Sequence, residues 1–154
     1  MFLLTERCII RNFILDDASD LYEILSDSMV MKYIEPPFSM EQTKAFIAHA
    51  GLCDIPLVYA LVWRKTEKVI GHVIFHPYEE ESFEIGWILK QSYWCKGIAN
   101  EITTELIKYA ADSGIKSFII ECNPMQSASI HIAKKFGFVF ERKDEECSIY
   151  RLML

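Results

Sequence analysis

The sequence predicts a mixed α/β fold in which a twisted, mostly antiparallel sheet of about six to seven strands is flanked by helices. Residues 82–89, SFEIGWIL, alternate apolar side chains with Glu84 and Gly86, and this period of two is typical of a strand. Residues 98–110 carry apolar side chains at three-to-four spacing, which predicts an amphipathic helix. A second apolar run follows at 117–122, and a strand, helix and strand of this length pair in parallel through a right-handed crossover.

Length and composition indicate one globular domain over residues 1–154, with 51% hydrophobic and 25% charged residues. No apolar run approaches the ~18 residues of a membrane span, and the charges of MFLLTER follow the apolar residues, which is the wrong order for a signal peptide. We therefore expect a cytoplasmic protein without a membrane partner.

The cysteines and the net charge exclude further classes. The five cysteines are odd in number and form no C-x-x-C pair, so we expect reduced thiols and no metal site. The net charge of −6 argues against a nucleic-acid partner and is compatible with a cationic amine substrate.

The first third of the chain reads as one strand and two helices. Residues 5–13 have the pattern of a strand, and Asp16 is expected to cap a helix with the sequence ASDLYEIL. Ser39 and Gln42 have the spacing of a capping box at the head of a second helix. Gly51 stands where the C-terminal cap of that helix is expected.

The middle of the chain predicts an antiparallel meander. Residues 57–64 and 69–76 are apolar runs joined by a polar link, and the strand at 82–89 follows a second polar link.

The C-terminal part predicts a short helix and a hairpin. Gly114 ends the central helix. After the strand at 117–122, a helix is expected over 127–136, followed by a hairpin of 138–142 with 148–154.

The segment that enters the central helix has the features of an anion-binding turn. The first turn of a helix presents unpaired N–H groups and the positive end of the macrodipole, so the N–H groups of Lys96 to Asn100 are suited to a pyrophosphate. Gly97 permits close approach to the backbone, and Lys96 adds a positive charge. The alternative is an ordinary loop that enters a helix, which one glycine beside one lysine does not exclude.

The strand and the turn together resemble the acetyl-CoA-binding core of the Gcn5-related N-acetyltransferases (GNATs). EIGWIL followed by YWCKGIANEI is similar to the family's pyrophosphate loop, which reads Arg or Gln, two residues, Gly, any residue, then Gly or Ala. Trp94 stands where Arg or Gln is usual, and Cys95 where glycine is frequent. Tryptophan at this place is similar to the ribosomal-protein alanine and serine N-acetyltransferase branch, which the first third of the chain also resembles.

The resemblance implies that the two parallel strands splay apart and that the pantetheine arm of acetyl-CoA enters between them, with Gly86 as a site for the bulge that starts the splay. The last third resembles the family's closing signature, with Gln126 where asparagine is usual, then Ser129 and Lys135. The cofactor-binding residues expected from the resemblance are Trp87, Ile88, Leu89, Cys95, Lys96, Gly97, Ile98, Ala99, Asn100, Gln126 and Lys135.

Glu84 is the candidate general base, because a glutamate on this strand acts as base in many family members and acetyl transfer to an amine needs an uncharged nucleophile. The alternative is a solvent-facing or ion-paired glutamate of the sheet. A backbone N–H at Ile88 or its neighbour is expected to hold the thioester oxygen.

Ser129 is the candidate proton donor to the leaving thiolate. Many members use a tyrosine five residues before the final Phe, and that place is Ala133 here. Ser129 lies about one turn earlier on the same helix face. The alternative is a helix-capping serine.

Other catalytic arrangements find no support in the sequence. There is no Gly-Lys-Ser/Thr phosphate loop and no G-x-G-x-x-G. Cys122 reads as a buried thiol, and His49, His72 and His76 show no constellation.

The leading expectation is an acetyl-CoA-dependent N-acetyltransferase that acts directly on a primary amine, either a protein N-terminus or a small molecule. The alternative is a catalytically silent acyl-CoA-binding module that regulates a partner. A homodimer formed through an exposed edge strand is compatible with either.

Overall fold

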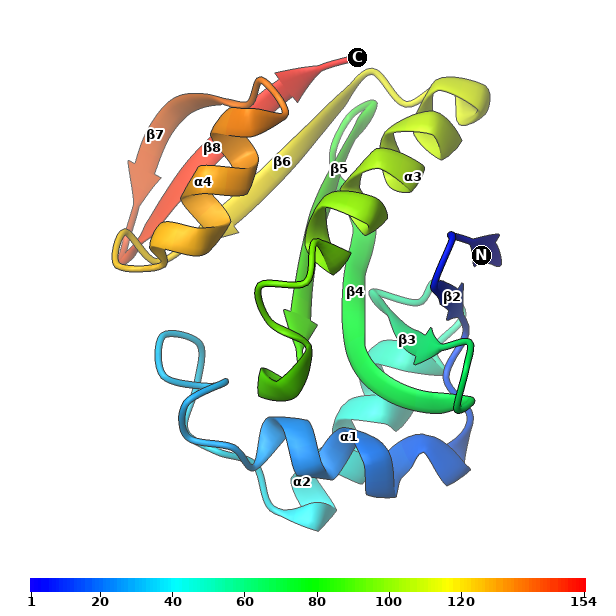
Figure 1. Ribbon diagram of the computed structural model, residues 1–154. Helices are drawn as coiled ribbons and strands as arrows, with labels where there is room; N and C mark the ends of the chain where they lie inside the picture. Colours follow the sequence, from blue (N-terminus) through cyan, green and yellow to red (C-terminus); the bar gives the residue numbers. More distant parts are fainter.

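The computed structural model describes residues 1–154, and all of its strands belong to one sheet (Figure 1). The strand order is β1-β2-β3-β4-β5-β6-β8-β7, and only β5 and β6 run parallel. The strands are β1 (Leu3–Leu4), β2 (Cys8–Arg11), β3 (Val58–Trp63), β4 (Lys68–Glu79), β5 (Ser82–Leu89), β6 (Ser117–Cys122), β7 (Val139–Asp144) and β8 (Cys147–Met153). The helices are α1 (Ala18–Leu25), α2 (Met40–Phe46), α3 (Ile98–Ser113) and α4 (Ser127–Lys135), with 3-10 turns η1 (Leu15–Asp17) and η3 (Gln91–Tyr93) and a π-helical turn η2 (Ile47–Gly51). None of the helices combines the length and the apolar character needed to cross a lipid bilayer.

The mixed, mostly antiparallel sheet is confirmed, but it has eight strands rather than six to seven. The predicted strand at 5–13 is shortened to Cys8–Arg11 because Thr5 and Cys8 form a turn, and β1 lies before the predicted range. The N–H of Thr5 donates to the carbonyl of Cys8 at 2.9 Å, and the N–H of Cys8 donates to the hydroxyl of Thr5 at 2.8 Å. This turn folds β1 back against β2 and adds one strand to the sheet.

The prediction that Asp16 caps α1 is wrong. The chain enters α1 through η1, and Asp17 is the residue before the helix. Asp17 is buried, accepts from the N–H of Ile14 at 2.9 Å and pairs with the guanidinium of Arg11 at 2.7 and 2.8 Å. The partners of Asp17 come from β2 and the following loop, which explains why it, and not the exposed Asp16, holds this helix start.

The capping box of α2 is confirmed, whereas its predicted C-terminal cap is not. The N–H of Ser39 donates to Oε1 of Gln42 at 2.7 Å, and the N–H of Gln42 donates to Oγ of Ser39 at 3.2 Å. The helix then widens into η2, where the N–H of Leu52 donates to the carbonyl of Ile47. Gly51 ends this turn without a left-handed conformation, and a Cβ there would lie 2.8 Å from the ring of Phe13. Close packing therefore explains this glycine.

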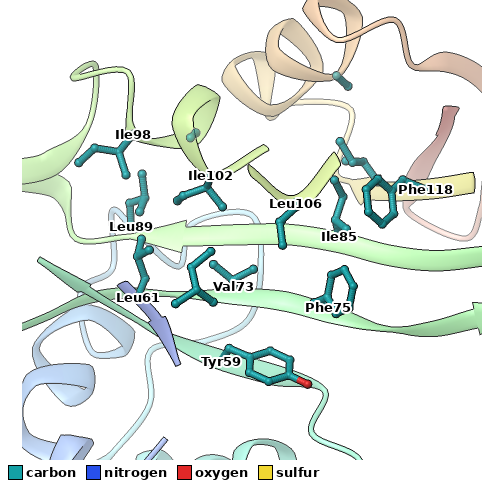
Figure 2. Packing of buried hydrophobic residues seen from close by; sticks show 14 of the residues in the cluster. Tyr59, Leu61, Val73, Phe75, Ile85, Leu89, Ile98, Ile102, Leu106 and Phe118 are labelled. Atoms are coloured by element: carbon teal, nitrogen blue, oxygen red, sulfur yellow. The ribbon is translucent and has the colours of Figure 1, made fainter. Parts of the chain in front are cut away.

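Helix α3 packs on one face of the sheet, as Figure 2 shows. Its apolar stripe of Ile98, Ile102 and Leu106 is 0–1% exposed and covers side chains of β4 and β5. The helices α1 and α2 contribute to a second cluster around Leu21, Ile24 and Ala60 on the opposite face. The sheet is therefore covered on both faces, with α3 on one side and α1 and α2 on the other (Figure 1).

The predicted bulge at Gly86 is absent. The β4–β5 register passes through the Ile74–Gly86 pair without a shift. A Cβ at Gly86 would lie 3.0 Å from Cδ1 of Ile74, so this glycine makes room for a cross-strand side chain.

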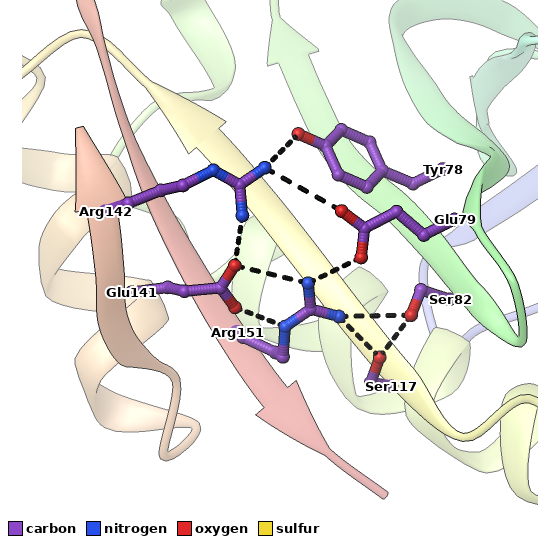
Figure 3. A network of polar contacts seen from close by, with 7 residues as sticks. All are labelled: Tyr78, Glu79, Ser82, Ser117, Glu141, Arg142 and Arg151. Carbon is purple, nitrogen blue, oxygen red and sulfur yellow. Dashed lines mark hydrogen bonds and ion pairs between the residues drawn. The ribbon is translucent and has the colours of Figure 1, made fainter. Parts of the chain in front are cut away.

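A polar network joins five strands, β4 to β8, where β5 and β6 begin (Figure 3). The hydroxyls of Ser82 and Ser117 lie 2.7 Å apart, and Nη1 of Arg151 donates to them at 3.1 and 3.0 Å. The same guanidinium donates to Glu79 at 2.9 Å and pairs with Glu141. The network therefore fastens the start of the parallel pair to β4 and to the C-terminal hairpin.

Candidate active site

The strands β5 and β6 pair over a short length and then separate. Their register runs from Ser82–Ser117 to Glu84–Ile119 and ends there, although β5 continues to Leu89 and β6 to Cys122. The two ribbons move apart toward the end of the sheet at which α3 begins (Figure 1). The expected splay is therefore present, and Glu84 lies at the point where it starts.

The edge of β5 that faces this gap offers free backbone groups. The N–H of Lys90 donates to the carbonyl of Ile70 on β4 at 2.8 Å. Hydrogen-bonding direction alternates along an antiparallel strand, so the N–H of Ile88 also faces β4. The N–H groups of Trp87 and Leu89 point the other way, toward the gap, so the geometry favours the neighbours of Ile88 as donors to a ligand oxygen.

The turn before α3 leaves a run of backbone donors unused. Gly97 has φ of 76° and Cys95 has φ of 57°, both in the left-handed region. No N–H group of residues 95–100 donates within the protein, and the first N–H to do so is that of Glu101, which bonds the carbonyl of Gly97 at 3.1 Å. The side chain of Lys96 is exposed beside these groups. The turn therefore presents bare amides at the positive end of a 16-residue helix, an arrangement that suits an anion.

Trp94 fastens this turn to the sheet. Its Nε1 donates to the carbonyl of Leu89 at 2.8 Å, so the side chain bridges the last residue of β5 and the residue that begins the turn. This contact gives the tryptophan a structural role at the place where the family usually has arginine or glutamine.

Arg7, which sequence reasoning missed, holds the turn from the other side. Its N–H and Nε donate to the two carboxylate oxygens of Glu101 at 2.8 and 2.7 Å, and its Nη1 donates to the carbonyl of Lys96 at 2.8 Å. Burial acts the other way, but hydrogen bonds from Thr5 and Arg7 hold the pKa of Glu101 below its usual value. Because Arg7 and Glu101 are 94 positions apart, no local motif could have revealed this pair.

Glu84 is paired with His76, which corrects the view that the histidines form no constellation. The two residues stand opposite each other in the β4–β5 register, and Nε2 of His76 lies 3.2 Å from Oε2 of Glu84. The other ring nitrogen, Nδ1, lies 2.9 Å from the carbonyl of Pro77. The hydrogen bond with Glu84 is the main reason why the pKa of His76 is raised. The one sequence signal for this pair was the predicted hairpin, because counting back from Glu84 across the β4–β5 turn leads to the residue on the opposite strand.

Residues of β6 and β8 also lie close to the His76–Glu84 pair. Glu121 of β6 adds to the raised pKa of His76 across the gap. Burial, then Glu121 and other carboxylates that include Glu84, raise the pKa of the Cys147 thiol, so the start of β8 also lies near the base.

The residues expected on α4 are arranged along its first turns. Oε1 of Gln126 accepts from the N–H of Asn123 at 2.8 Å, so this amide closes the turn after β6. Ser129 is the third residue of the helix, which begins after Gln126, so it is not the cap. Its hydroxyl is half-buried and makes no hydrogen bond within the protein, whereas Ala133 is fully buried and Lys135 is exposed. Of the expected residues Gln126, Ser129 and Lys135, only Gln126 makes a side-chain hydrogen bond within the protein.

A cavity of about 380 Å³ opens next to the end of β6. One wall of the cavity is the segment that follows α1. The other wall is formed by the residue after β6 and by the β7–β8 turn. Its lining residues are Ser28, Met31, Lys32, Tyr33, Ile34, Glu35, Pro36, Pro37, Asn123 and Glu146.

Comparison with protein families and curated proteins gives consistent results. Residues 7–139 match the family model described as "Acetyltransferase (GNAT) domain". An uncharacterized N-acetyltransferase, YnaD, from Bacillus subtilis (strain 168) is 33% identical over 150 residues, which are 96% of this chain and 88% of that protein. The ribosomal-protein-serine acetyltransferase of Escherichia coli (strain K12) is 31% identical over 80 residues, which are 50% of this chain and 45% of that protein.

Solved structures agree with this fold over the whole chain. A GNAT-family acetyltransferase from Bacillus anthracis superposes with a TM-score of 0.87 at 29% identity, covering 100% of this chain and 98% of that one. The ribosomal L7/L12 alpha-N-protein acetyltransferase RimL, solved in complex with coenzyme A, gives a TM-score of 0.83 at 17% identity, with 100% and 98% covered.

Proposed function

Because the chain belongs to the GNAT acetyltransferase family, we propose that residues 1–154 form a single N-acetyltransferase domain that moves an acetyl group from acetyl-CoA directly to a primary amine. The observation that carries the proposal is the separation of β5 and β6 immediately after Glu84, next to a helix N-terminus whose amides have no partner. A sheet that remained paired along its full length would leave no path between the base and a cofactor on the far side.

The residues beside the gap fit acetyl-CoA. The free N–H groups of residues 95–100 and the charge of Lys96 suit the pyrophosphate, and a Cβ at Gly97 would meet only Nη2 of Arg7, at 3.7 Å, so the turn is open to a ligand. The N–H groups of Trp87 and Leu89 suit the amide and thioester oxygens. Oδ1 of Asn100 is buried and lacks a hydrogen-bond donor in the protein, so it has capacity for a donor of the cofactor.

The side chains around the gap supply the acid–base chemistry. Acetyl-CoA, when bound, provides the acetyl group as a thioester. Glu84 removes a proton from the incoming ammonium, so that the amine becomes nucleophilic. The N–H of Leu89 or Trp87 donates to the thioester oxygen as negative charge develops on it. The hydroxyl of Ser129 donates a hydrogen bond to the sulfur of the leaving thiolate and passes it a proton taken from water, so the serine is protonated again at the end of the step.

The acceptor is a primary amine of a protein N-terminus or of a small molecule. The 380 Å³ cavity beside residues 28–37 is of a size to admit the end of such a molecule. The E. coli relative is named for a protein acceptor and matches half of this chain, so protein N-termini belong in the first set of amines to be tested.

Release of coenzyme A thiol in the presence of a panel of amines tests this function. The Glu84→Gln variant should lose about 100-fold or more in kcat/KM while its Kd for acetyl-CoA, measured by calorimetry, stays unchanged. Glu41→Gln serves as the control, because Glu41 is an exposed carboxylate of α2 that contacts neither Glu84 nor His76.

Tight binding of acetyl-CoA without turnover on any amine would contradict the proposal and favour a silent acyl-CoA-binding module. Absence of any affinity for acetyl-CoA would contradict both functions.

A further inference from the structure

We propose that His76 is a positioning residue that orients Glu84 and accepts from it the proton taken from the acceptor amine. The inference rests on the proposed function, in which Glu84 receives that proton first. It adds a second titrating group to the machinery, one that the GNAT resemblance did not indicate.

The geometry leaves His76 two defined protonation states. Its side chain is 22% exposed and that of Glu84 is 17% exposed, so the contact is shielded while one edge of the ring still reaches solvent. Both ring nitrogens face acceptors, which are the carboxylate of Glu84 at 3.2 Å and the carbonyl of Pro77 at 2.9 Å. The imidazolium, with two N–H groups, satisfies both contacts.

In the neutral form, the Pro77 carbonyl selects the tautomer. The single remaining proton stays on Nδ1, where it donates to Pro77, and this leaves the lone pair of Nε2 directed at Glu84. Neutral His76 and ionised Glu84 can therefore accept one proton between them, whereas the imidazolium–carboxylate pair already holds that proton.

The proton path balances at each step. The N–H bond of the substrate ammonium breaks and an O–H bond forms on Glu84. That O–H bond then breaks as an Nε2–H bond forms on His76, so the carboxylate is restored and the imidazolium carries the charge. His76 then loses this proton to water, which reaches its partly exposed side chain, and no oxidant or further reactant is needed.

Carboxylates surround the ring from the neighbouring strands. Glu84 of β5 lies directly opposite, and Glu121 of β6 acts across the gap, and both raise the pKa of His76. Burial alone lowers it but is outweighed.

His72 shows what this strand does to a histidine without such partners. It stands four positions earlier on the same face of β4, is 2% exposed and packs against Phe46. Burial lowers the pKa of His72 to about 4, and its Nδ1 has no hydrogen-bond partner. The raised pKa of His76 therefore follows from the hydrogen bond with Glu84, then from the Pro77 carbonyl and the charges of Glu84 and Glu121, and is not a general property of the sheet.

The test is the pH dependence of kcat/KM for acetyl-CoA, followed with the amine that supports most turnover in the panel. In the wild type, the acid limb reports the pair and should lie above the ordinary histidine pKa of about 6.5. In His76→Gln the imidazole that sets this limb is absent, so the limb should move to lower pH by more than about one unit. The plateau should fall about tenfold, because a free carboxylate is a weaker base. The ionisation of the amine affects both proteins alike and cancels in the comparison.

Three further measurements separate the alternatives. His131→Gln, a change at an exposed histidine of α4, should leave the limb in place. Nitrogen-15 NMR of the wild type should show the pKa of His76 above the ordinary histidine value of about 6.5, and Glu84→Gln should lower it. The Kd for acetyl-CoA should be the same in His76→Gln and the wild type.

A reduced plateau with an unmoved acid limb in His76→Gln would overturn the inference while leaving the proposed function intact. A wild type that turns over no amine would overturn both.

Discussion

Gly97 and Gly114 stand at opposite ends of α3 in the same left-handed conformation, with φ of 76° and 75°. They differ in their surroundings, since Gly97 belongs to the proposed pyrophosphate turn and a Cβ at Gly114 would meet nothing within 4 Å. A side chain at either position costs about 1–2 kcal/mol of backbone strain. The two glycines are therefore a matched pair in which the effect on the cofactor can be separated from the effect on the helix.

We expect Gly97→Ala to raise the Kd for acetyl-CoA at least about tenfold, because a Cβ would crowd the amides that face the phosphates. Gly97→Ala and Gly114→Ala should each lower the free energy of unfolding by about 1 kcal/mol. Gly114→Ala should leave the Kd for acetyl-CoA unchanged. Calorimetry and urea titration of both variants check this. Equal affinities in the two variants would show that the diphosphate binds elsewhere.

At the scale of single residues, the sequence predicts roles that depend on local geometry and misses those that depend on a distant partner. Gly97, Gly114 and the Ser39–Gln42 capping box were predicted from neighbours within one turn, and the structure shows each of them in its expected conformation. His76 and Arg7 were missed because their partners come from other strands or from another helix.

The element on which the site depends most is α3, and it is held by β5 and by the segment just before β2. Trp94 donates a hydrogen bond to the end of β5. Arg7 donates hydrogen bonds both to Glu101 in the first turn and to the carbonyl of Lys96. The helix start is thus fixed before a ligand arrives, so little ordering cost remains to be met on binding.

Arg7→Met should weaken acetyl-CoA binding about tenfold and lower the unfolding free energy by about 1 kcal/mol. The reason is that Glu101 loses its hydrogen bond and ion pair with the guanidinium, and the carbonyl of Lys96 loses its donor. Arg11→Met is the control, since Arg11 makes a similar two-point contact with Asp17 at the start of α1, away from the turn. It should lose comparable stability and keep its affinity for acetyl-CoA. A similar loss of affinity in both variants would mean that the effect is general loosening of the fold.

Element boundaries follow the sequence best where the pattern is strong on its own. The bounds of β5 and β6 agree with the predicted 82–89 and 117–122, because one alternates cleanly and the other is a mostly apolar, mostly buried segment. The β4 strand continues to Glu79, beyond the predicted His76, because pairing with β5 stabilises a polar stretch that has no strand signal of its own. Pairing partners, not propensity, decide such ends.

On the scale of the whole molecule, the network around Arg151 joins the two parts of the sheet. Arg151 is 21% exposed and contacts residues from the β4–β5 link, β6 and β7, whereas Arg142 is 40% exposed and lies at the rim (Figure 3). A single shielded guanidinium with four partners contributes more than an exposed ion pair.

Arg151→Met should therefore lower the free energy of unfolding by about 2 kcal/mol, since it leaves two buried serine hydroxyls and two carboxylates short of a donor. Arg142→Met should lower it by less than about 1 kcal/mol. Urea unfolding at neutral pH and again at high salt distinguishes them, because salt screens the exposed pair more. Equal losses of unfolding free energy in the two variants would show that Arg151 contributes no more to stability than Arg142.

The sheet can be regarded as two plates that meet along one short seam of three residue pairs. Beyond the seam, β5 runs on for about 17 Å at the usual rise per residue, so a rotation of only about 5° at the seam displaces its far end by about 1.5 Å. The β7–β8 hairpin belongs to the same plate as β6, so we expect substitutions in it to change the width of the gap between β5 and β6. Preference among acyl chains of different bulk can thus vary between homologues whose cofactor turns are identical.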